Sequence, residues 1–176
     1  MSGKSTFLRT IGINLVLAYA GAPVCAGALN TQLFHIYSCI RINDSLTEGL
    51  SYFYAEVKRL KIILNAIDSK SFWPVLFLID EIFKGTNNKE RLQGSLSYIK
   101  ELSVKNGIGI ISTHDLELAR LESEIKSLKN WHFKEDIKNG RMHFDFTLRR
   151  GPSPTTNALK IMQLEGLPVK PDQKME

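Results

Sequence analysis

The sequence predicts an α/β fold, a layered domain with a mainly parallel central sheet and a peripheral antiparallel hairpin. Helical segments alternate with short apolar strands through most of the chain, which is typical of a parallel sheet covered on both faces. Near the C-terminus, Asn139-Gly140 separates two β-like runs, and this dipeptide favours a tight hairpin turn. The 176 residues, 43% hydrophobic and 23% charged, are ordinary for one globular domain.

The first half of the chain predicts a helix, a strand and a second helix. Thr6–Tyr19 is apolar on nearly all sides, so we expect this helix to be buried on more than one face. Leu33–Ile40 alternates in the manner of a strand. Ser51–Asp68 predicts a helix with an apolar stripe of Phe53, Val57, Leu60 and Leu64. Its charged residues are expected mostly outside that stripe: Glu56, Lys58, Arg59 and Lys61.

The middle of the chain predicts two buried strands, each followed by a helix. Val75–Ile79 and Ile108–Ser112 are short continuous apolar runs, as found in the centre of a parallel sheet. Lys89–Lys105 and Leu116–Leu128 have the periodicity of helices. These four segments complete the alternation on which the α/β prediction rests.

The C-terminal part predicts a different, antiparallel element. Trp131–Ile137 and Arg141–Leu148 form the two strands of the hairpin, followed by a short helix over Thr156–Leu164. Residues after Pro168 are polar and are expected to be frayed. One face of the hairpin is expected to be buried through Phe144, Phe146 and Leu148.

Charge and cysteine content limit the class of protein. The net charge of +5 allows an anionic partner, either a nucleotide or a nucleic acid, although scattered basic residues also suit a solvated surface. Cys25 and Cys39 lack the spacing of metal ligands, and Cys39 lies in an apolar run typical of a reduced core thiol. The apolar run Phe7–Ala22 is shorter than the ~20 residues that a membrane span needs. We therefore expect a cytoplasmic protein without a membrane partner.

The first residues match the second half of the phosphate-binding loop G-x-x-x-x-G-K-[ST]. Lys4 would reach the β- and γ-phosphates of ATP, and the Ser5 hydroxyl would face Mg²⁺. Backbone N–H groups at the start of the helix would hold the anionic oxygens. The first glycine of the pattern would lie upstream of Met1, so we expect a piece of a longer protein with weak or absent hydrolysis on its own. The expected nucleotide-binding residues here are Ser2, Gly3, Lys4, Ser5 and Thr6.

Polar residues also stand at the ends of the two buried strands. Asp80 and Glu81 follow the first, and His114 follows the second. Because ligands bind at the carboxyl edge of an open parallel sheet, we expect these groups to converge on the phosphate loop. The first carboxylate of such a pair can hold Mg²⁺ with Ser5, while the second can orient and deprotonate the attacking water. The sequence thus predicts Ser5 and Asp80 as metal ligands, and Glu81 and His114 as catalytic residues.

In these motifs the chain resembles the ATPase domain of the MutS family of DNA mismatch-repair proteins, within the ABC-type P-loop NTPases. Leu78–Glu81 is similar to the family's Walker B motif, and Ser112–Asp115 to its switch-histidine motif. Asn43–Glu56 is similar to the insertion that separates MutS-like proteins from other P-loop proteins. The resemblance covers residues 1–168 and implies an ATPase domain without its first strand and the front half of its Walker A loop. Residues 169–176 would form a frayed tail.

The resemblance also implies partners. ATP would drive closure of a dimer, formed with a second copy or a MutS-like partner, and DNA would be bound by regions outside this chain. Each nucleotide would be closed by a segment of the partner that matches Lys84–Lys89, with Asn87 as the contacting residue. The family's repair members usually carry serine or threonine at Asn87 and Asn88. An amide can still donate to a phosphate oxygen, and we expect a divergent branch of the family.

Two other functions stay open at this point. A nucleotide-poor, DNA-associated dimerisation module would account for the half loop and for Asn87. An ABC-type ATPase of another DNA-maintenance pathway would use the same motifs, although the segment Asn43–Glu56 argues against it.

Overall fold

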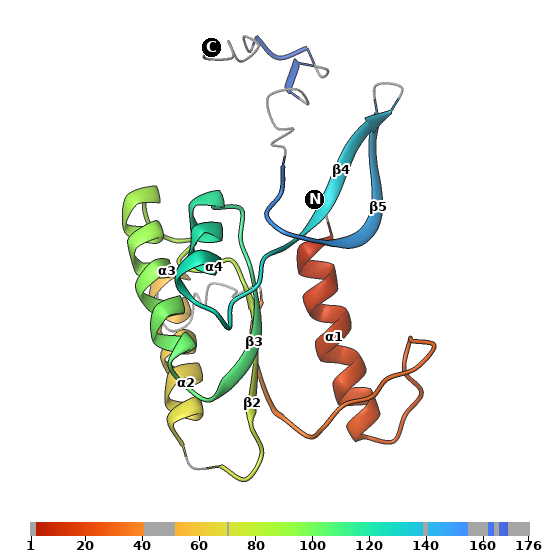
Figure 1. The fold of residues 1–176 in the computed structure, drawn as a ribbon, viewed down its shortest axis with the longest axis vertical. Helices are drawn as coiled ribbons and strands as arrows, with labels where there is room; N and C mark the ends of the chain where they lie inside the picture. The colour runs from red at the N-terminus through yellow and green to blue at the C-terminus, as the bar shows by residue number, and fades with distance from the viewer. Residues whose placement is uncertain are drawn as a thin grey trace. The chain divides into compact units, whose positions relative to one another are not determined.

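A computed structural model of the chain forms two compact units. The larger comprises residues 4–128, and the smaller comprises residues 129–176 with 1–3 (Figure 1). The structure describes residues 3–40, 52–69, 71–138, 141–154, 162–163 and 166–168. No helix among these residues is long and apolar enough to cross a membrane.

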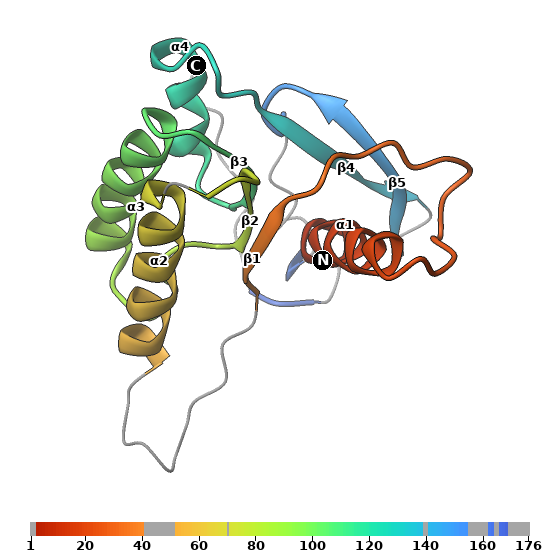
Figure 2. The ribbon, with the colours of Figure 1, turned by 90° about the horizontal axis from the view of Figure 1, so that it is seen from below.

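The larger unit is built on a parallel sheet of three strands. Their order is β1 (His35–Cys39), β2 (Val75–Asp80) and β3 (Gly107–Ser112), with β2 in the centre. Every residue of β2 is buried, because helices cover both faces of the sheet and a strand lies on each side (Figure 2). The predicted parallel sheet and its buried central strand are confirmed. The first strand is shorter than the predicted Leu33–Ile40.

One helix covers the first face of the sheet. α1 (Lys4–Tyr19) packs against β2 and β3, and a Cβ atom at Gly12 would lie 3.1 Å from the Leu78 side chain (Figure 2). The expectation that α1 is buried on more than one side is wrong for the described structure. Ile13 and Val16 are 59% and 57% exposed, because only the side of α1 that faces the sheet is covered.

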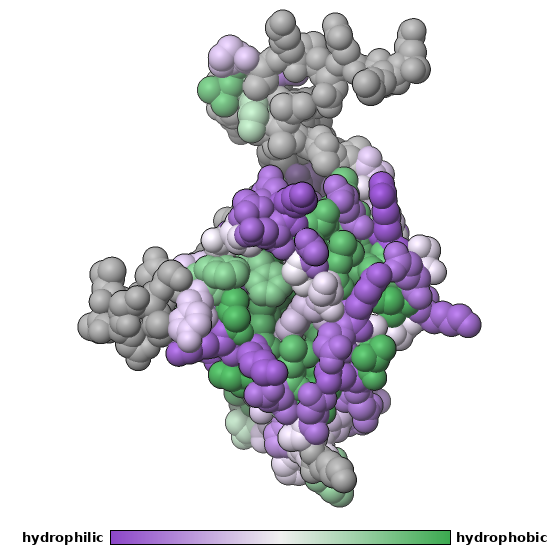
Figure 3. Space-filling model, turned by 90° about the vertical axis from the view of Figure 1, so that its left-hand side faces the viewer, coloured by the Kyte–Doolittle hydropathy of each residue, from purple (hydrophilic) through white to green (hydrophobic). Residues whose placement is uncertain are grey.

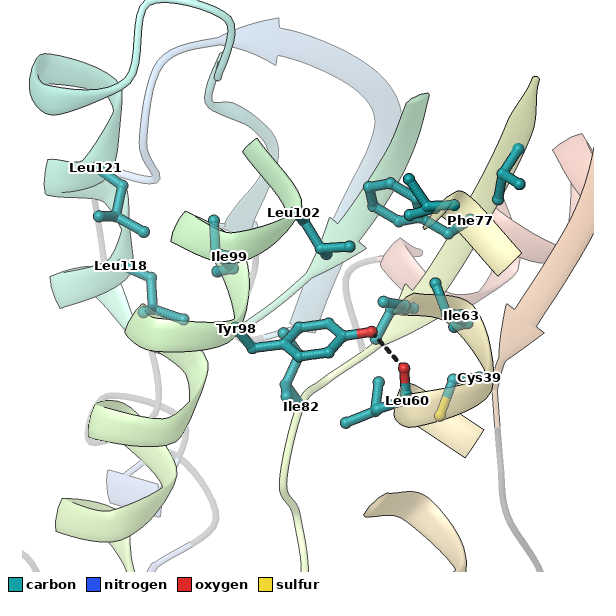
Figure 4. Close-up of a cluster of buried hydrophobic side chains, with 13 residues drawn as sticks. Cys39, Leu60, Ile63, Phe77, Ile82, Tyr98, Ile99, Leu102, Leu118 and Leu121 are labelled. Atoms are coloured by element: carbon teal, nitrogen blue, oxygen red, sulfur yellow. Dashed lines mark hydrogen bonds between the residues drawn. The ribbon is translucent and has the colours of Figure 1, made fainter. Parts of the chain in front are cut away.

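The hydrophobic core lies between the other face of the sheet and two helices, α2 (Tyr52–Asp68) and α3 (Asn88–Ser103) (Figure 4). Within it, the Tyr98 hydroxyl donates to the backbone carbonyl of Leu60 at 2.9 Å. Cys39 is 4% exposed, as expected for a core thiol, and burial raises its pKa to about 11. The thiol is therefore protonated and unreactive at neutral pH.

The prediction of which face of α2 is buried is partly wrong. Its buried residues are Glu56, Leu60, Ile63 and Ile67, whereas Phe53 is 37% exposed. Glu56, expected outside the apolar stripe, is only 1% exposed because its carboxylate accepts a backbone hydrogen bond. The other charged residues, Lys58, Arg59 and Lys61, are exposed as predicted. On the side of the larger unit that carries α2 and α3, hydrophilic and apolar side chains are interspersed (Figure 3).

The segment after β2 departs from the predictions at two places. β3 is only partly buried, with Ile108 54% exposed. The predicted helix Leu116–Leu128 is instead a 3₁₀ turn, η1 (Leu116–Arg120), and one turn of α-helix, α4 (Leu121–Glu124). A 3₁₀ turn places residues three apart on one side, which buries both Leu118 and Leu121 against the core.

The smaller unit contains the predicted antiparallel hairpin. β4 (Trp131–Lys138) pairs with β5 (Arg141–Arg150), with an irregularity between Phe133 and Glu135. The expected buried face is wrong, since Phe146 is 67% exposed and Leu148 36% exposed. Two strands alone cannot bury the apolar residues on one face. The Asn-Gly turn, most of the predicted helix 156–164 and the tail 169–176 lie outside the described residues.

Candidate nucleotide-binding site

The carboxyl ends of β2 and β3 meet at one edge of the sheet, as predicted. Asp80 and Ser112 are paired in the parallel register, and each is 7% exposed. The Ser112 hydroxyl donates to Asp80 Oδ1 at 2.5 Å, and the backbone N–H of Glu81 donates to the Ser112 carbonyl at 3.0 Å. The position of the two acidic residues is therefore fixed by the neighbouring strand.

The start of α1 brings Ser5 to this edge. The Ser5 side chain lies close enough to the Asp80 carboxylate to lower its pKa, although 75 positions separate the two residues in the sequence. Burial alone would raise the pKa of Asp80. The hydrogen bond from Ser112 and the nearby Ser5 side chain, with the charges of Lys84 and Arg9, outweigh burial and lower the pKa below its ordinary value of 3.8. Asp80 is therefore an anion at neutral pH.

The donor atoms at this position suit a magnesium ion. A serine hydroxyl and one carboxylate are hard oxygen ligands, and Mg²⁺ in nucleotide sites needs few protein ligands beside water and phosphate. The described residues contain no group of three or more His, Cys, Asp or Glu that could hold a metal ion by themselves. The two predicted metal ligands, Ser5 and Asp80, therefore lie together in a pair that fits Mg²⁺ bound with a nucleotide.

Of the other residues of the half loop, Lys4 and Thr6 belong to the first turn of α1. Lys4 is the first helical residue and Thr6 is exposed. Gly3 has φ of +91°, a conformation that L side chains rarely adopt. Ser2 lies outside the described residues. The nucleotide-binding roles of these residues stay predictions.

Glu81 lies in a sharp turn between two groups that can hold its carboxylate. Its φ is +60°, which is uncommon for a residue other than glycine and turns the chain directly after β2. Lys84 Nζ is 3.5 Å from Glu81 Oε2, and His114 Nδ1 is 3.4 Å from Glu81 Oε1. The structure thus brings the two predicted catalytic residues, Glu81 and His114, into contact beside Asp80.

Glu56 also belongs to this site, although the sequence did not predict it as a site residue. The backbone N–H of Phe83 donates to Glu56 Oε1 at 2.6 Å, while Oε2 has no hydrogen-bond partner among the residues that the structure describes. Burial raises the pKa of Glu56, and the N–H groups of Phe83, Lys84 and Gly85 reduce that rise without reversing it. A Cβ atom at Gly85 would lie 2.8 Å from that of Phe53, so the loop runs directly against the first turn of α2. Helical periodicity placed Glu56 outside; its only signal was membership of the MutS-like segment 43–56.

Asn87 begins α3. Its side-chain oxygen accepts the backbone N–H of Glu90 at 3.0 Å, and the Thr86 hydroxyl donates to the Glu90 carboxylate at 2.7 Å. Serine, threonine and asparagine are all favoured at this capping position, so Asn87 keeps the helix start where other sequences use a hydroxyl. The amide nitrogen of Asn87 is not used by the cap. Contact between Asn87 and a nucleotide stays a prediction.

Comparison with known proteins identifies the family. The family model described as MutS domain V matches residues 1–173. The chain belongs to this family. The resemblance that the motifs indicated is therefore confirmed at the level of the family.

Relatives of this MutS domain V chain are DNA mismatch repair proteins. It is 29% identical to the DNA mismatch repair protein MutS of Aquifex pyrophilus over 170 residues, which cover 96% of the chain and 19% of that protein. Identity to the protein of the same name from Lactobacillus johnsonii is 31% over 172 residues, 97% of the chain and 20% of that protein. The Natronomonas pharaonis MutS is 27% identical over 172 residues, with 96% and 19% covered. The chain thus spans about a fifth of the length of these relatives.

Proposed function

We propose that this chain is the ATP-binding and ATP-hydrolysing domain of a MutS-like DNA mismatch-repair protein, with Mg²⁺ as the metal. The observation that carries the proposal is that Ser5, in the first turn of α1, lies near Asp80, at the end of β2, and helps to lower its pKa. This proximity joins the half phosphate loop to the acidic strand end. Glu81 and His114 lie in contact beside it.

In this proposal each residue has a distinct task. Lys4 and the backbone N–H groups at the start of α1 bind the phosphates, where the helix N-terminus favours negative charge. Ser5 and Asp80 hold Mg²⁺, which would offset charge on the β- and γ-phosphate oxygens when bound. Glu81 accepts the proton of the attacking water. His114, in contact with Glu81, is assigned the position facing the γ-phosphate.

Two substitutions test this assignment on the full-length protein. Glu81→Gln removes the proton acceptor but keeps the side-chain volume, so turnover should fall about 10²- to 10⁴-fold while ATP still binds. Lys4→Ala should weaken binding of ATP–Mg²⁺ measured by calorimetry. Unchanged turnover in Glu81→Gln, or unchanged affinity in Lys4→Ala, contradicts the role given to that residue.

ATP-driven dimer closure is a further part of the proposal. The loop from Lys84 to Asn87 follows the catalytic Glu81 directly and ends at a firmly capped helix, so it is suited to present Asn87 to a second nucleotide site. Light scattering of the Glu81→Gln protein should show an ATP-dependent dimer, and Asn87→Ala should reduce its population. An oligomeric state that does not depend on ATP contradicts closure of the dimer by nucleotide.

A second candidate is a DNA-associated dimerisation module that binds nucleotide poorly. It is favoured by the use of the Asn87 side-chain oxygen as a helix cap, which commits that atom to the chain itself. Full-length protein that dimerises without measurable ATP binding would support this module. ATPase activity insensitive to mismatched DNA would instead indicate a DNA-maintenance pathway other than mismatch repair.

A further inference from the structure

A bidentate ion pair links α3 to the loop that carries His114. Arg91, in the first turn of α3, donates from Nε to Asp115 Oδ2 at 3.1 Å and from Nη2 to Asp115 Oδ1 at 2.9 Å. The side chains of Arg91 and Asp115 are only 15% and 18% exposed. Two parallel bonds to a planar guanidinium fix the carboxylate in orientation as well as in distance.

The carboxylate of Asp115 does not serve the helix that it precedes. Asp115 stands at the N-cap position of η1, where aspartate normally accepts a backbone N–H, yet its side chain makes no capping bond. The Thr113 hydroxyl oxygen accepts the Asp115 backbone N–H at 3.0 Å and holds the loop in a local turn. The side chain of Asp115 therefore binds Arg91 instead of capping η1.

The same carboxylate faces His114. Asp115 Oδ1, the oxygen that accepts from Arg91 Nη2, is 3.7 Å from His114 Nε2. On the other side of the ring, His114 Nδ1 is 3.4 Å from Glu81 Oε1. The imidazole thus lies between two carboxylates, and Arg91 holds one of them in place. Because the His114 side chain is 51% exposed, packing alone gives it little restraint.

We infer that Arg91 and Asp115 are positioning residues, which hold the His114 ring against Glu81 and in the orientation that the reaction needs. This inference rests on the proposed ATPase function. The pair ties His114 to α3, whose capped start at Asn87 ends the loop that begins at Glu81. The segments that carry Glu81 and His114 are therefore held in a fixed position relative to each other. Breaking the Arg91–Asp115 ion pair would remove this restraint on the His114 ring.

The test separates turnover from nucleotide binding in the full-length protein. Asp115→Asn removes the charge and keeps the size, while Arg91→Lys keeps the charge and loses the forked geometry. Each should lower kcat by about tenfold or more through displacement of the ring, with the dissociation constant of ATP changed less than about threefold. The double variant should be little worse than either single one, because both remove the same restraint.

A matched control is available on the same helix. Lys100 of α3 pairs with Glu124 of α4 at 2.7 Å, and both side chains are 54% exposed. Glu124→Gln also breaks an ion pair between α3 and the segment after β3, but that pair involves neither His114 nor Asp115, so kcat should not change. Thermal unfolding of all variants shows the structural contribution of each pair.

The outcomes are distinguishable. Normal kcat in Asp115→Asn and Arg91→Lys, with an active parent protein, makes the pair purely structural and overturns the inference while the proposed function stands. A fall in kcat matched by an equal loss of ATP affinity or of folded protein overturns it as well. A parent protein that neither binds nor hydrolyses ATP removes the proposed function, and the inference with it.

Discussion

Replacing Glu56 by alanine is expected to lower the free energy of unfolding by about 2–3 kcal/mol. The larger contribution is the Phe83 N–H, which loses the Oε1 acceptor at 2.6 Å in a partly buried contact. Leaving such a donor unpaired costs about 1–2 kcal/mol. Loss of one methylene from a side chain that is 1% exposed adds about 0.8 kcal/mol.

The matched variant Glu56→Gln separates the hydrogen bond from the charge. Its amide oxygen can still accept from Phe83, and its volume is almost that of glutamate, so it should stay within about 1 kcal/mol of the parent protein. Urea unfolding followed by far-UV circular dichroism measures all three proteins. Equal destabilisation by alanine and glutamine would show that the Phe83 hydrogen bond is not the source of the effect.

The pH dependence of the same variants reports on the buried charge. Burial raises the pKa of Glu56 above its ordinary value of 4.5. At pH values between 4.5 and the folded-state pKa, the folded state therefore binds more protons than the unfolded state. The contribution of Glu56 to stability therefore falls as pH rises through the folded-state pKa, and it recovers on acidification. A tenfold change in the acid dissociation constant corresponds to about 1.4 kcal/mol.

The stability difference between parent and Glu56→Gln should therefore shift in favour of the parent as pH is lowered from neutral, through the folded-state pKa, to the ordinary value of 4.5. Asp80 does not interfere with the measurement. Because its pKa is lowered in the folded state, its contribution to stability is lost only below its ordinary pKa of 3.8. A difference that stays constant over this range refutes the idea that the Glu56 carboxylate is ionised at a cost in the folded protein.

Three further substitutions test the core by thermal or urea unfolding. Gly109→Ala should destabilise by about 1–3 kcal/mol, because its Cβ would overlap the ring of Phe77 on the paired strand; equal stability would mean that the ring moves freely. Tyr98→Phe should lower the free energy of unfolding by about 1 kcal/mol through loss of the hydrogen bond to the Leu60 carbonyl; an unchanged free energy would show that this bond makes no net contribution to stability. Ser95→Ala should stabilise by about 0.5–1 kcal/mol, since the buried Ser95 hydroxyl has no hydrogen-bond partner in the described part of the chain and alanine favours the helix; destabilisation would point to a bond made by that hydroxyl.

Several elements could be predicted because the signal is local. The run Val75–Ile79 is apolar at every position, as in a strand covered on both faces, and β2 is buried throughout. The hairpin followed from two alternating runs around Asn139-Gly140. The helix Leu116–Leu128 failed because periodicity near three and a half residues does not distinguish an α-helix from a 3₁₀ turn followed by a short α-turn.

Residues far apart in the sequence could be assigned to the site only in part. Convergence of Ser5, Asp80, Glu81 and His114 followed from the rule that parallel strands end at one edge, although the direct contacts did not. Glu56 was placed outside because a charged residue normally faces water. Its burial depends on backbone N–H groups released by the turn after Glu81, and no periodicity of α2 contains that information.

The sequence by itself determined which chemical groups the site contains, their order along the chain and the MutS family to which the chain belongs. Local patterns carry this information because motif spacing and strand ends are properties of neighbouring residues. Only the tertiary structure decided which groups are paired: Ser5 with Asp80, Glu81 with His114, and Arg91 with Asp115. Pairing depends on the distance between side chains from different elements, and that distance is set by how the helices and strands pack.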